Sequence, residues 1–456
     1  MAEILIPFAL SDEFLERFKV AVTEQQVDFI RGVLEGVNPA DISALLDEFN
    51  AEESKYVIDL LATEVSAEIL NDLDEDVQTR FLKNFTSEEI AGYVDHLDSD
   101  DGVDMLMDLP VKTREEVIAM MADAEKARHI VDLLRYEEDV AGGLMQKEFI
   151  KANINWTVTQ TIEEIRRQAE KVEKLYSVYV VDDQGLLKGR VSLKRIILAK
   201  DNTRIQDLYD PEVHAVETYM DEEEVAQLMR KYDLDAVPVL NVQGKLVGRI
   251  TIDDIVDVIT ELAEEERNMM AGISEDVEED DSVWRITRAR LPWLIVGMLG
   301  GLLGAQFIGL FERDIMLIPA MAFFIPLITA TGGNVGIQSS SIILQSLANP
   351  SAFSESAWNR FMKALLVALV NGVILGALVF GINMTFGQDV KLALVVSLAL
   401  VSVVCLASFM GTVTPLVLNR FGINPALASG PFITTANDLL GLGVYFVVAR
   451  LILTAI

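Results

Sequence analysis

Five long apolar segments fill residues 284–456, and no other feature of the chain constrains its fold as strongly. We expect these segments at Leu291–Leu310, from Ile315 onward, near Ala364–Phe380, near Leu392–Leu418 and near Ala426–Leu453. Each is long enough to cross about 30 Å of hydrocarbon at a rise of about 1.5 Å per residue. This part of the chain is therefore predicted to form a membrane domain of five helices.

The charge of the chain changes at the same place. Residues 284–456 hold five acids and nine bases, whereas residues 1–283 hold 66 acids and 28 bases. The net charge of −34 is thus carried by the N-terminal part. A strongly acidic surface repels nucleic acid and anionic lipid and attracts cations. We expect no nucleic-acid partner, and the clustering of the acids favours metal binding.

Basic residues predict the orientation of the chain in the membrane. Five spans place the two termini on opposite sides. The bases Arg285, Arg288 and Arg290 precede the first span, whereas the loops on the other side carry only Arg313 and Lys391. Because cytoplasmic loops are enriched in bases, the N-terminal domains are expected in the cytoplasm. The first residues lack the basic start and long apolar stretch of a signal peptide.

A 24-residue repeat organises residues 30–130. Leu45, Ile69 and Tyr93 form one column of this repeat. The other five columns are Leu46/Leu70/Val94, Phe49/Leu73/Leu97, Val57/Phe81/Met105, Ile58/Leu82/Leu106 and Leu61/Phe85/Leu109. Stacked helix pairs that share one continuous apolar core are typical of such a repeat.

A second repeat, offset by 59 residues, lies within residues 138–259. The segment 178–190 matches the segment 237–249, and each copy reads as strand, Gly turn, strand and helix. A helical stretch precedes each copy, at Thr161–Val172 and Asp221–Lys231. The pattern resembles a tandem pair of cystathionine-β-synthase (CBS) domains, which act as regulatory sensors. Such pairs often bind adenosine nucleotides, but no Gly-rich phosphate loop occurs here, so ATP binding stays open.

Asp438 is the only acid deep inside an apolar segment. A carboxylate at membrane depth is costly unless it faces a partner or water, so it marks a candidate cation site. The second segment is predicted to be interrupted between Thr329 and Ser341, where glycines, Asn334 and Gln338 gather. Glycine at membrane depth is tolerated where the backbone lines a cavity, and also where helices pack tightly. The residues expected to line a hydrated path are Gly332, Asn334, Gln338, Pro431, Thr434, Thr435, Asn437 and Gly441.

Oxygen ligands around Asp438 suit a hard cation. Magnesium prefers oxygen, dehydrates reluctantly and usually keeps several waters. The path offers no thiol or imidazole for zinc or copper. Because one acid is few for a divalent ion, a two-fold homodimer would supply a second Asp438. These ligands do not separate magnesium from manganese, cobalt or calcium.

Six acids follow one face of the segment that leads into the first span. They lie within about a 120° arc at about 100° per residue. They are Asp253, Asp254, Asp257, Glu261, Glu264 and Glu265, with Val256, Val258, Ile259, Leu262 and Ala263 on the other side. More acids follow at Glu275, Asp276, Glu278, Glu279, Asp280 and Asp281. Like charges on one face repel unless cations lie nearby, so divalent ions would hold this helix in place and release it when they leave. A solvated amphipathic face is the alternative.

The order of these parts resembles that of MgtE-type magnesium transporters. The resemblance is carried by Leu133–Met145 at the start of the CBS pair, by Gly332–Ser339 and by Thr434–Asp438. It implies a homodimeric, magnesium-selective channel in a bacterial inner membrane, closed when cytosolic magnesium bridges acidic domains. Asp438 would be the selectivity acid. The regulatory ligands implied are Asp254, Asp257, Glu265 and Glu266 on the connecting helix, Asp221, Glu223 and Asp233 in the second CBS copy, and Asp95 and Asp98 in the helical domain.

The resulting fold prediction is a multidomain chain of α and α/β parts. Its domains are a helical regulatory domain at 1–132, CBS domains at 133–200 and 201–259, an acidic connecting helix and linker at 253–283, and a five-helix pore domain at 284–456. No His-Glu-x-x-His, Walker loop or Gly-x-Ser-x-Gly occurs, so we expect no enzyme. The alternative functions are a coupled secondary transporter with a nucleotide-sensing CBS pair and a metal sensor that does not transport.

Overall fold

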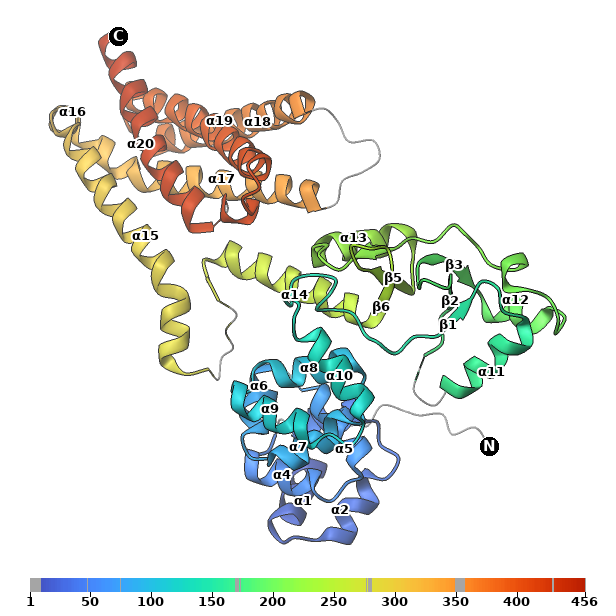
Figure 1. The fold of residues 1–456 in the computed structure, drawn as a ribbon. Coiled ribbons are helices and arrows are strands. Elements are labelled where there is room, and N and C mark those ends of the chain that lie inside the picture. Colours follow the sequence, from blue (N-terminus) through green and yellow to red (C-terminus); the bar gives the residue numbers. More distant parts are fainter. Residues whose placement is uncertain are drawn as a thin grey trace. The chain divides into compact units, whose positions relative to one another are not determined.

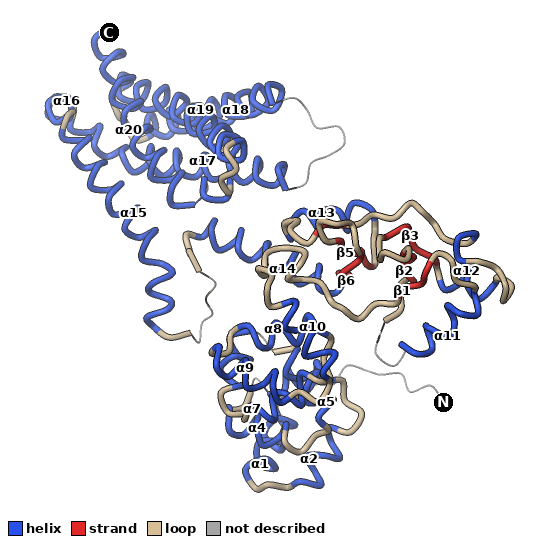
Figure 2. Tube along the Cα trace, in the orientation of Figure 1, coloured by secondary structure: helices blue, strands red, loops and turns tan. Residues whose placement is uncertain are grey.

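The computed structural model describes residues 10–46, 48–73, 75–168, 172, 174–275, 277, 281–348, 357–428 and 430–455. The chain divides into two compact units, Met1–Ile259 and Thr260–Ile456. Figure 1 labels most helices and strands of both units, and Figure 2 shows that strands occur only in the first unit among the parts described. The acids Asp276, Glu278, Glu279 and Asp280 of the connecting linker lie outside the described residues.

Ten short helices begin the first unit. They are α1 Asp12–Thr23, α2 Val27–Leu34, α3 Pro39–Leu46, α4 Ala51–Ile58, α5 Thr63–Asn71, α6 Glu75–Leu82, α7 Ser87–Val94, α8 Ser99–Met107, α9 Val111–Met120 and α10 Ala124–Leu133. Leu45, Ile69 and Tyr93 are all buried, as the 24-residue repeat predicts. Of the other fifteen column residues, all but Phe49 and Leu61 are buried as well. The prediction of stacked helix pairs is confirmed.

Two three-stranded sheets follow, one for each copy of the second repeat. The first contains β1 Lys151–Asn153, β2 Val178–Val181 and β3 Leu187–Val191, with helices α11 Val158–Gln168 and α12 Leu193–Leu198 and the 3₁₀ turn η1 Ile205–Asp207. The second contains β4 Val216–Glu217, β5 Ala236–Leu240 and β6 Leu246–Thr251, with helix α13 Glu222–Tyr232. In each sheet the first pairing is parallel and the second antiparallel.

The hairpin turns of the two sheets explain why the 59-residue repeat can be recognised in the sequence. Gly185 and Gly244 adopt φ values of +81° and +74°, which L side chains rarely adopt. A register shift follows the same position in both hairpins, at Val180/Val181 and at Val239/Leu240. The tandem α/β repeat predicted from the sequence is therefore confirmed.

The acidic connecting segment is one helix, α14 Ile252–Ala271. Its first turns bury the apolar face opposite the acids only in part. Val256 and Ile259 are 53% and 38% exposed, whereas Asp254 is partly buried. Ile255 and Val258 are the buried apolar residues of this helix. The acidic face, expected to be solvated or to lie near cations, is therefore partly buried at Asp254.

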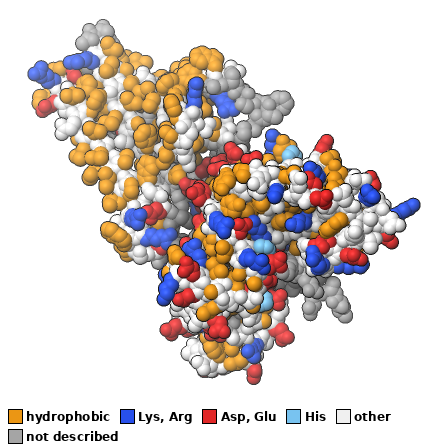
Figure 3. Space-filling model, viewed as in Figure 1, with side chains coloured by type: hydrophobic (Ala, Val, Ile, Leu, Met, Phe, Trp, Pro, Cys, Tyr) orange, Lys and Arg blue, Asp and Glu red, His pale blue; other side chains and the backbone are white. Residues whose placement is uncertain are grey.

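The second unit contains five helices that are long and apolar enough to cross a membrane. They belong to α15 Val283–Gly309, α17 Ile325–Ala348, α18 Ala357–Thr385, α19 Val390–Arg420 and α20 Gly430–Ala455, with the short elements α16 Glu312–Leu317, η2 Pro319–Phe324 and η3 Pro425–Ala428 between them. Hydrophobic side chains cover most of the visible surface of this unit, whereas acids and bases are interspersed over the first unit (Figure 3). The prediction of a membrane domain with five spans is confirmed.

The predicted interruption of the second span between Thr329 and Ser341 is wrong. Helix α17 runs without a break through these residues, and the irregular backbone lies before it, at Ile318–Phe324. Thr329 donates its hydroxyl to the carbonyl of Ile325 at 3.1 Å, one helical turn back. The glycines serve close helix packing, since Gly332, Gly333 and Gly336 are all buried.

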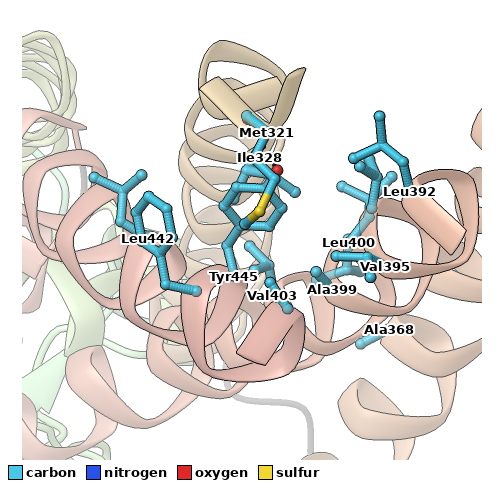
Figure 4. Packing of buried hydrophobic residues seen from close by; sticks show 14 residues of the cluster. Met321, Ile328, Ala368, Leu392, Val395, Ala399, Leu400, Val403, Leu442 and Tyr445 are labelled. Carbon is cyan, nitrogen blue, oxygen red and sulfur yellow. Dashed lines mark hydrogen bonds between the residues drawn. The ribbon is translucent and has the colours of Figure 1, made fainter. Parts of the chain in front are cut away.

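Helix α19 lies at the centre of the second unit and packs against α17, α18 and α20. Val395, Ala399 and Val403 of α19 belong to one buried cluster with Leu442 and Tyr445 of α20 (Figure 4). The buried Tyr445 donates its hydroxyl to the carbonyl of Met321 in η2, at 2.9 Å. This bond and the apolar cluster hold α20 in place within the unit.

Candidate ion-binding sites

Asp438 lies on α20 beside the glycine-rich part of α17. A Cβ atom at Gly333 would lie 3.7 Å from Oδ1 of Asp438 and 3.1 Å from Cγ2 of Thr434. The carboxylate thus lies beside the α17 backbone at Gly333, and a side chain there would crowd Thr434 more than Asp438. Asp438 is partly exposed, and no other acid occurs in the five long helices. The site combines one carboxylate with an accessible surface at membrane depth.

Helix α17 presents opposite chemistry on its two sides. Its glycines pack inside the unit, whereas Asn334, Gln338 and Gln345 are exposed. At about 100° per residue these three amides fall on one narrow face. Amide groups exposed to hydrocarbon cost free energy because no lipid tail can hydrogen-bond to them. This stripe therefore requires either water or a second protein surface.

The other residues predicted to line a path are divided between the surface and the interior. Pro431, Thr434 and Thr435 are partly exposed, and Thr434 donates its hydroxyl to the carbonyl of Gly430 at 2.9 Å. Gly441 is buried and would bring a Cβ to 3.3 Å from Val403. Asn437 is 2% exposed and lies in the interior of the unit.

An apolar groove of about 730 Å³ runs beside the same helix. Leu303 and Phe307 of α15 and Leu439 and Val447 of α20 contribute to its lining, and Gln306 is its one amide. A hard divalent cation needs several oxygen ligands, which this groove does not supply. It is therefore no alternative to the surface around Asp438.

In the first unit, acids gather where the helical repeat meets the CBS pair. Asp100 of α8 accepts a hydrogen bond from Nε2 of Gln146 at 3.0 Å, and Oγ of Ser99 donates to Glu148 at 2.6 Å. Gln146 in turn accepts from Nε of the buried Arg249, at 2.8 Å. On α14, Asp254 accepts the backbone N–H and the hydroxyl of Thr251 at 2.9 and 2.7 Å.

Burial makes the charged form of these carboxyl groups unfavourable. It raises the pKa of Asp98 to about 7, with further contributions from Glu148 and Asp101. It also raises the pKa of Asp254 to about 6. The pKa of Asp100 lies well above its usual range because of burial first and the neighbouring Asp254 second. Bound cations would relieve the same repulsion that protons relieve here.

Three other predicted regulatory ligands lie on one helix but not at one site. Asp221 caps the N-terminus of α13 by accepting the N–H of Glu223 at 3.0 Å, and Glu223 accepts from Gln227 at 3.1 Å. Asp233 caps the other end of the helix in a left-handed conformation. Twelve residue steps of about 1.5 Å separate Asp221 from Asp233 by about 18 Å, so Asp233 does not join the other two.

The remaining predicted ligands are spread over several elements. Asp95 follows α7 and accepts the backbone N–H groups of Ala122 and Asp123 at 2.7 and 3.3 Å. Asp257 is exposed, and its pKa is raised by partial burial and then by Asp253 and Asp72. Glu265 and Glu266 are exposed on α14. Within the described ranges, no three acidic, histidine or cysteine side chains stand close enough to chelate one ion.

Sequence reasoning missed Asp100 and Gln345. The Asp98-Ser99-Asp100-Asp101 run was a visible signal for the first, because three acids in four residues occur at a helix start. Gln345 continues the spacing of Asn334 and Gln338 by seven residues, which is two helical turns. Both therefore had a pattern that pointed to them.

Three family models match the chain. A divalent cation transporter model, MgtE, matches residues 325–448, and a model of the MgtE intracellular N domain matches residues 37–139. The CBS domain model matches residues 139–202 and 205–261. Together they place the divalent cation transporter model on α17 to α20, which include Asp438, and the intracellular N-domain and CBS models on the acidic unit.

Named relatives cover nearly the whole chain. The magnesium transporter MgtE of Thermus thermophilus is 34% identical over 445 residues, which is 96% of this chain and 98% of that protein. The magnesium transporter MgtE of Enterococcus faecalis is 35% identical over 72% of each chain. A crystal structure of the cytosolic domain of the Mg²⁺ channel MgtE in complex with ATP covers 53% of this chain and 98% of its own, at 36% identity and a TM-score of 0.50. A crystal structure of the soluble part of a magnesium transporter covers 55% of this chain and 99% of its own, at 28% identity and a TM-score of 0.50. The chain belongs to the MgtE family of divalent cation transporters.

Proposed function

We propose that the chain transports Mg²⁺ across a membrane along a path formed by α17 and α20, and that Mg²⁺ bound to acids of the first unit closes this path. The single observation that carries the proposal is the carboxylate of Asp438, which is partly exposed against the backbone of Gly333. An acid at membrane depth is retained for ions or protons, because its desolvation is costly. The magnesium transporters named among the relatives support Mg²⁺ as the cargo.

The path is proposed to form between two copies of the chain. The exposed amides Asn334, Gln338 and Gln345 would face water or the partner instead of lipid. A two-fold axis beside α17 would bring two copies of Asp438 to one path, which doubles the charge offered to a divalent ion. Mg²⁺ would keep most of its waters, and Thr434 and nearby backbone carbonyls would accept hydrogen bonds from them.

Regulation is proposed to act through the buried acids of the first unit. The pKa values of Asp98, Asp100 and Asp254 are raised, first because burial disfavours their charged forms and then because other acids lie nearby. A divalent cation would bind such a cluster more tightly than isolated surface acids, since it removes their mutual repulsion. No ready chelating trio occurs among the described residues, so binding would require these side chains to turn toward one another. Asp257, Glu265 and Glu266 are proposed to act with them on α14.

The arrangement in the cell follows from the distribution of bases. Arg285, Arg288 and Arg290 at the start of α15 favour a cytoplasmic first unit. A bacterial inner membrane is proposed as the location, since the magnesium transporters among the relatives come from bacteria. The proposed domains are 1–132, 133–200, 201–259, the connecting helix and linker 253–283, and the pore domain 284–456. ATP is proposed as a second ligand of the CBS pair, because the cytosolic domain of a relative was crystallised with it.

Flux measurement tests the cargo. Purified full-length chain is reconstituted in liposomes, and Mg²⁺ entry is followed while Mg²⁺ on the side of the first unit is varied from micromolar to millimolar. We expect flux that needs no sodium or proton gradient and that falls as this Mg²⁺ rises. Asp438→Asn keeps the size of the side chain and removes its charge, so we expect a folded protein with flux reduced by about tenfold or more. Gradient-dependent flux of another solute, or full Mg²⁺ flux in Asp438→Asn, would contradict the proposal.

A further inference from the structure

The side chain next to Asp438 is unusual for a packed helix. Asn437 is 2% exposed, and neither its Nδ2 nor its Oδ1 has a hydrogen-bond partner within the described residues. A buried amide without partners costs about 1–3 kcal/mol relative to an apolar side chain of similar shape. The hydrogen-bonding groups of this amide are therefore unused within the described residues, and the packing contacts of the side chain point to its role.

Asn437 fills the space that the missing side chain of Gly336 leaves on α17. A Cβ atom at Gly336 would lie 1.9 Å from Nδ2 of Asn437, 3.1 Å from its Cγ and 3.4 Å from Ile433. The amide is thus seated directly on the α17 backbone. One turn earlier on the same helix, a Cβ atom at Gly333 would lie 3.1 Å from Cγ2 of Thr434 and 3.7 Å from Oδ1 of Asp438, so the helices also meet there, less tightly. The two glycines form consecutive contacts along one seam between α17 and α20.

Gly336 cannot move away from this contact, because α19 packs against it as well. A Cβ atom at Gly411 of α19 would lie 2.4 Å from the carbonyl oxygen of Gly336 and 2.9 Å from Cβ of Ser339. The backbone at Gly336 is therefore held between Gly411 and Asn437. A shift of α20 along α17 would break the contact at Gly336 and the contact at Gly333 together.

We propose that Asn437 is a positioning residue whose size fixes the register of α20 against α17 and so places the Asp438 carboxylate beside Gly333. The inference rests on the proposed function, because the position of Asp438 matters only if this carboxylate handles the ion. Asn437 does not touch the cation; it acts through the adjacent Asp438. Its volume, and not its hydrogen-bonding capacity, is the property that the position requires.

Variants that move side-chain volume from Asn437 of α20 to Gly336 of α17 test this inference. The variants are Asn437→Ala, Gly336→Ala, the double variant that combines them, and Asn437→Leu, made in the full-length chain and reconstituted in liposomes. Flux is measured with Mg²⁺ and, separately, with Co²⁺, because the ratio of the two reports the geometry around Asp438 and not merely the amount of folded protein. Leu440→Ala, at an exposed position on the same helix, is the control.

We expect Asn437→Ala and Gly336→Ala each to lower Mg²⁺ flux by about tenfold or more and to change the Mg²⁺/Co²⁺ ratio, since displacements near 1 Å at a site have effects of this size. In the double variant the added methyl group enters the space that the amide leaves, so flux and ratio return toward those of the unmodified chain. Asn437→Leu keeps the branched shape and the number of side-chain heavy atoms and should retain both, which keeps the test decisive if Gly336→Ala does not fold.

Three results would overturn the inference. Asn437→Ala with unchanged flux and ratio would show that the position does not matter. Loss of flux in both Asn437→Leu and the double variant would show that the amide itself is required. The same change in Leu440→Ala would show a general effect of truncating α20. Absence of Mg²⁺ flux in the unmodified chain would instead contradict the proposed function, so the two failures are distinguishable.

Discussion

Replacing Asp254 with asparagine tests whether the acids proposed to regulate transport are held in an unfavourable charged state when no cation is bound. Burial raises the pKa of Asp254 to about 6, although hydrogen bonds from Thr251 oppose the rise. An ordinary aspartate titrates near 3.9, so the ionised group destabilises the folded unit by about 3 kcal/mol at high pH. Asparagine keeps an acceptor for the N–H of Thr251 and carries no charge.

The sign of the pH dependence follows from the direction of the shift. Since the folded-state pKa lies above the unfolded value, the folded unit binds the proton more tightly, and the stability that this proton provides is lost as pH rises through about 6. The advantage of Asp254→Asn over the unmodified chain should therefore be near zero at about pH 4 and approach about 3 kcal/mol at about pH 8. Mg²⁺ should reduce this advantage, because it neutralises the unmodified carboxylate.

The neighbouring Asp253→Asn is a matched control with the opposite sign. Burial opposes ionisation there too, but hydrogen bonds from Thr251 and Lys174 lower the pKa of Asp253 overall, and Nζ of Lys174 lies 2.9 Å from Oδ2. The pair is about half exposed, so its loss should destabilise the unit by less than about 1 kcal/mol at high pH. Because folding lowers the pKa of Asp253, Asp253→Asn loses stability only at pH values above the pKa that this residue has in the unfolded chain.

Urea unfolding of a fragment containing residues 1–275 measures the effects of both substitutions. We expect this fragment to fold alone, because the soluble part of a relative has been crystallised by itself. The free energy of unfolding is determined by circular dichroism at low, intermediate and high pH, with a chelator and then with Mg²⁺. An Asp254→Asn fragment that is no more stable than the unmodified fragment at high pH would refute the expected cost of the charged carboxylate. Equal gains for Asp254→Asn and Asp253→Asn would also refute it, because they would reflect net charge alone.

Two further predictions concern the second unit. Tyr445→Phe removes the buried hydrogen bond to the carbonyl of Met321 and should destabilise the unit by about 1–3 kcal/mol, seen as a lower thermal midpoint in detergent. Gly272→Ala should loosen the end of α14 from the start of α20, because residue 272 has φ +77° and an added Cβ would lie 2.6 Å from Cγ of Pro431. Hydrogen exchange at residues 268–275 should then increase, whereas Gly297→Ala, with no neighbour within 4 Å, should leave it unchanged.

Features that depend on local repetition were readable from the sequence. The 24-residue columns place Leu45, Ile69 and Tyr93 in equivalent helices, and each burial follows from its neighbours within the same repeat. The hairpins were equally clear, because Gly185 and Gly244 need a positive φ at matching positions. Hydrophobic length likewise predicted the five long helices.

Features that depend on distant packing were not readable. The repeat aligns Asp100 with Glu52, which is exposed, so it predicts an exposed Asp100. Asp100 is instead buried because the segment that follows the helical repeat covers α8, to which Gln146 and Glu148 are hydrogen-bonded.

The glycines of α17 led to the wrong prediction of a helix break for a related reason. Glycine indicates either a helix break or close packing, and only the position of α19 decides between them.

The contrast between Asn334 and Asn437 shows what sequence reasoning lacked at the ion path. Asn334 follows Gly333 and Asn437 precedes Asp438, each within a long apolar helix, and both are expected from the sequence to line the path. Asn334 is exposed and Asn437 is buried, because α17 turns its glycine face toward the face of α20 that carries residue 437. The rotation of a helix about its axis is set by the partner surface and not by its own composition. Consequently the same residue type offers hydrogen bonds to the exterior at one position and sets a helix register at the other, and only variants that separate volume from polarity distinguish the two roles.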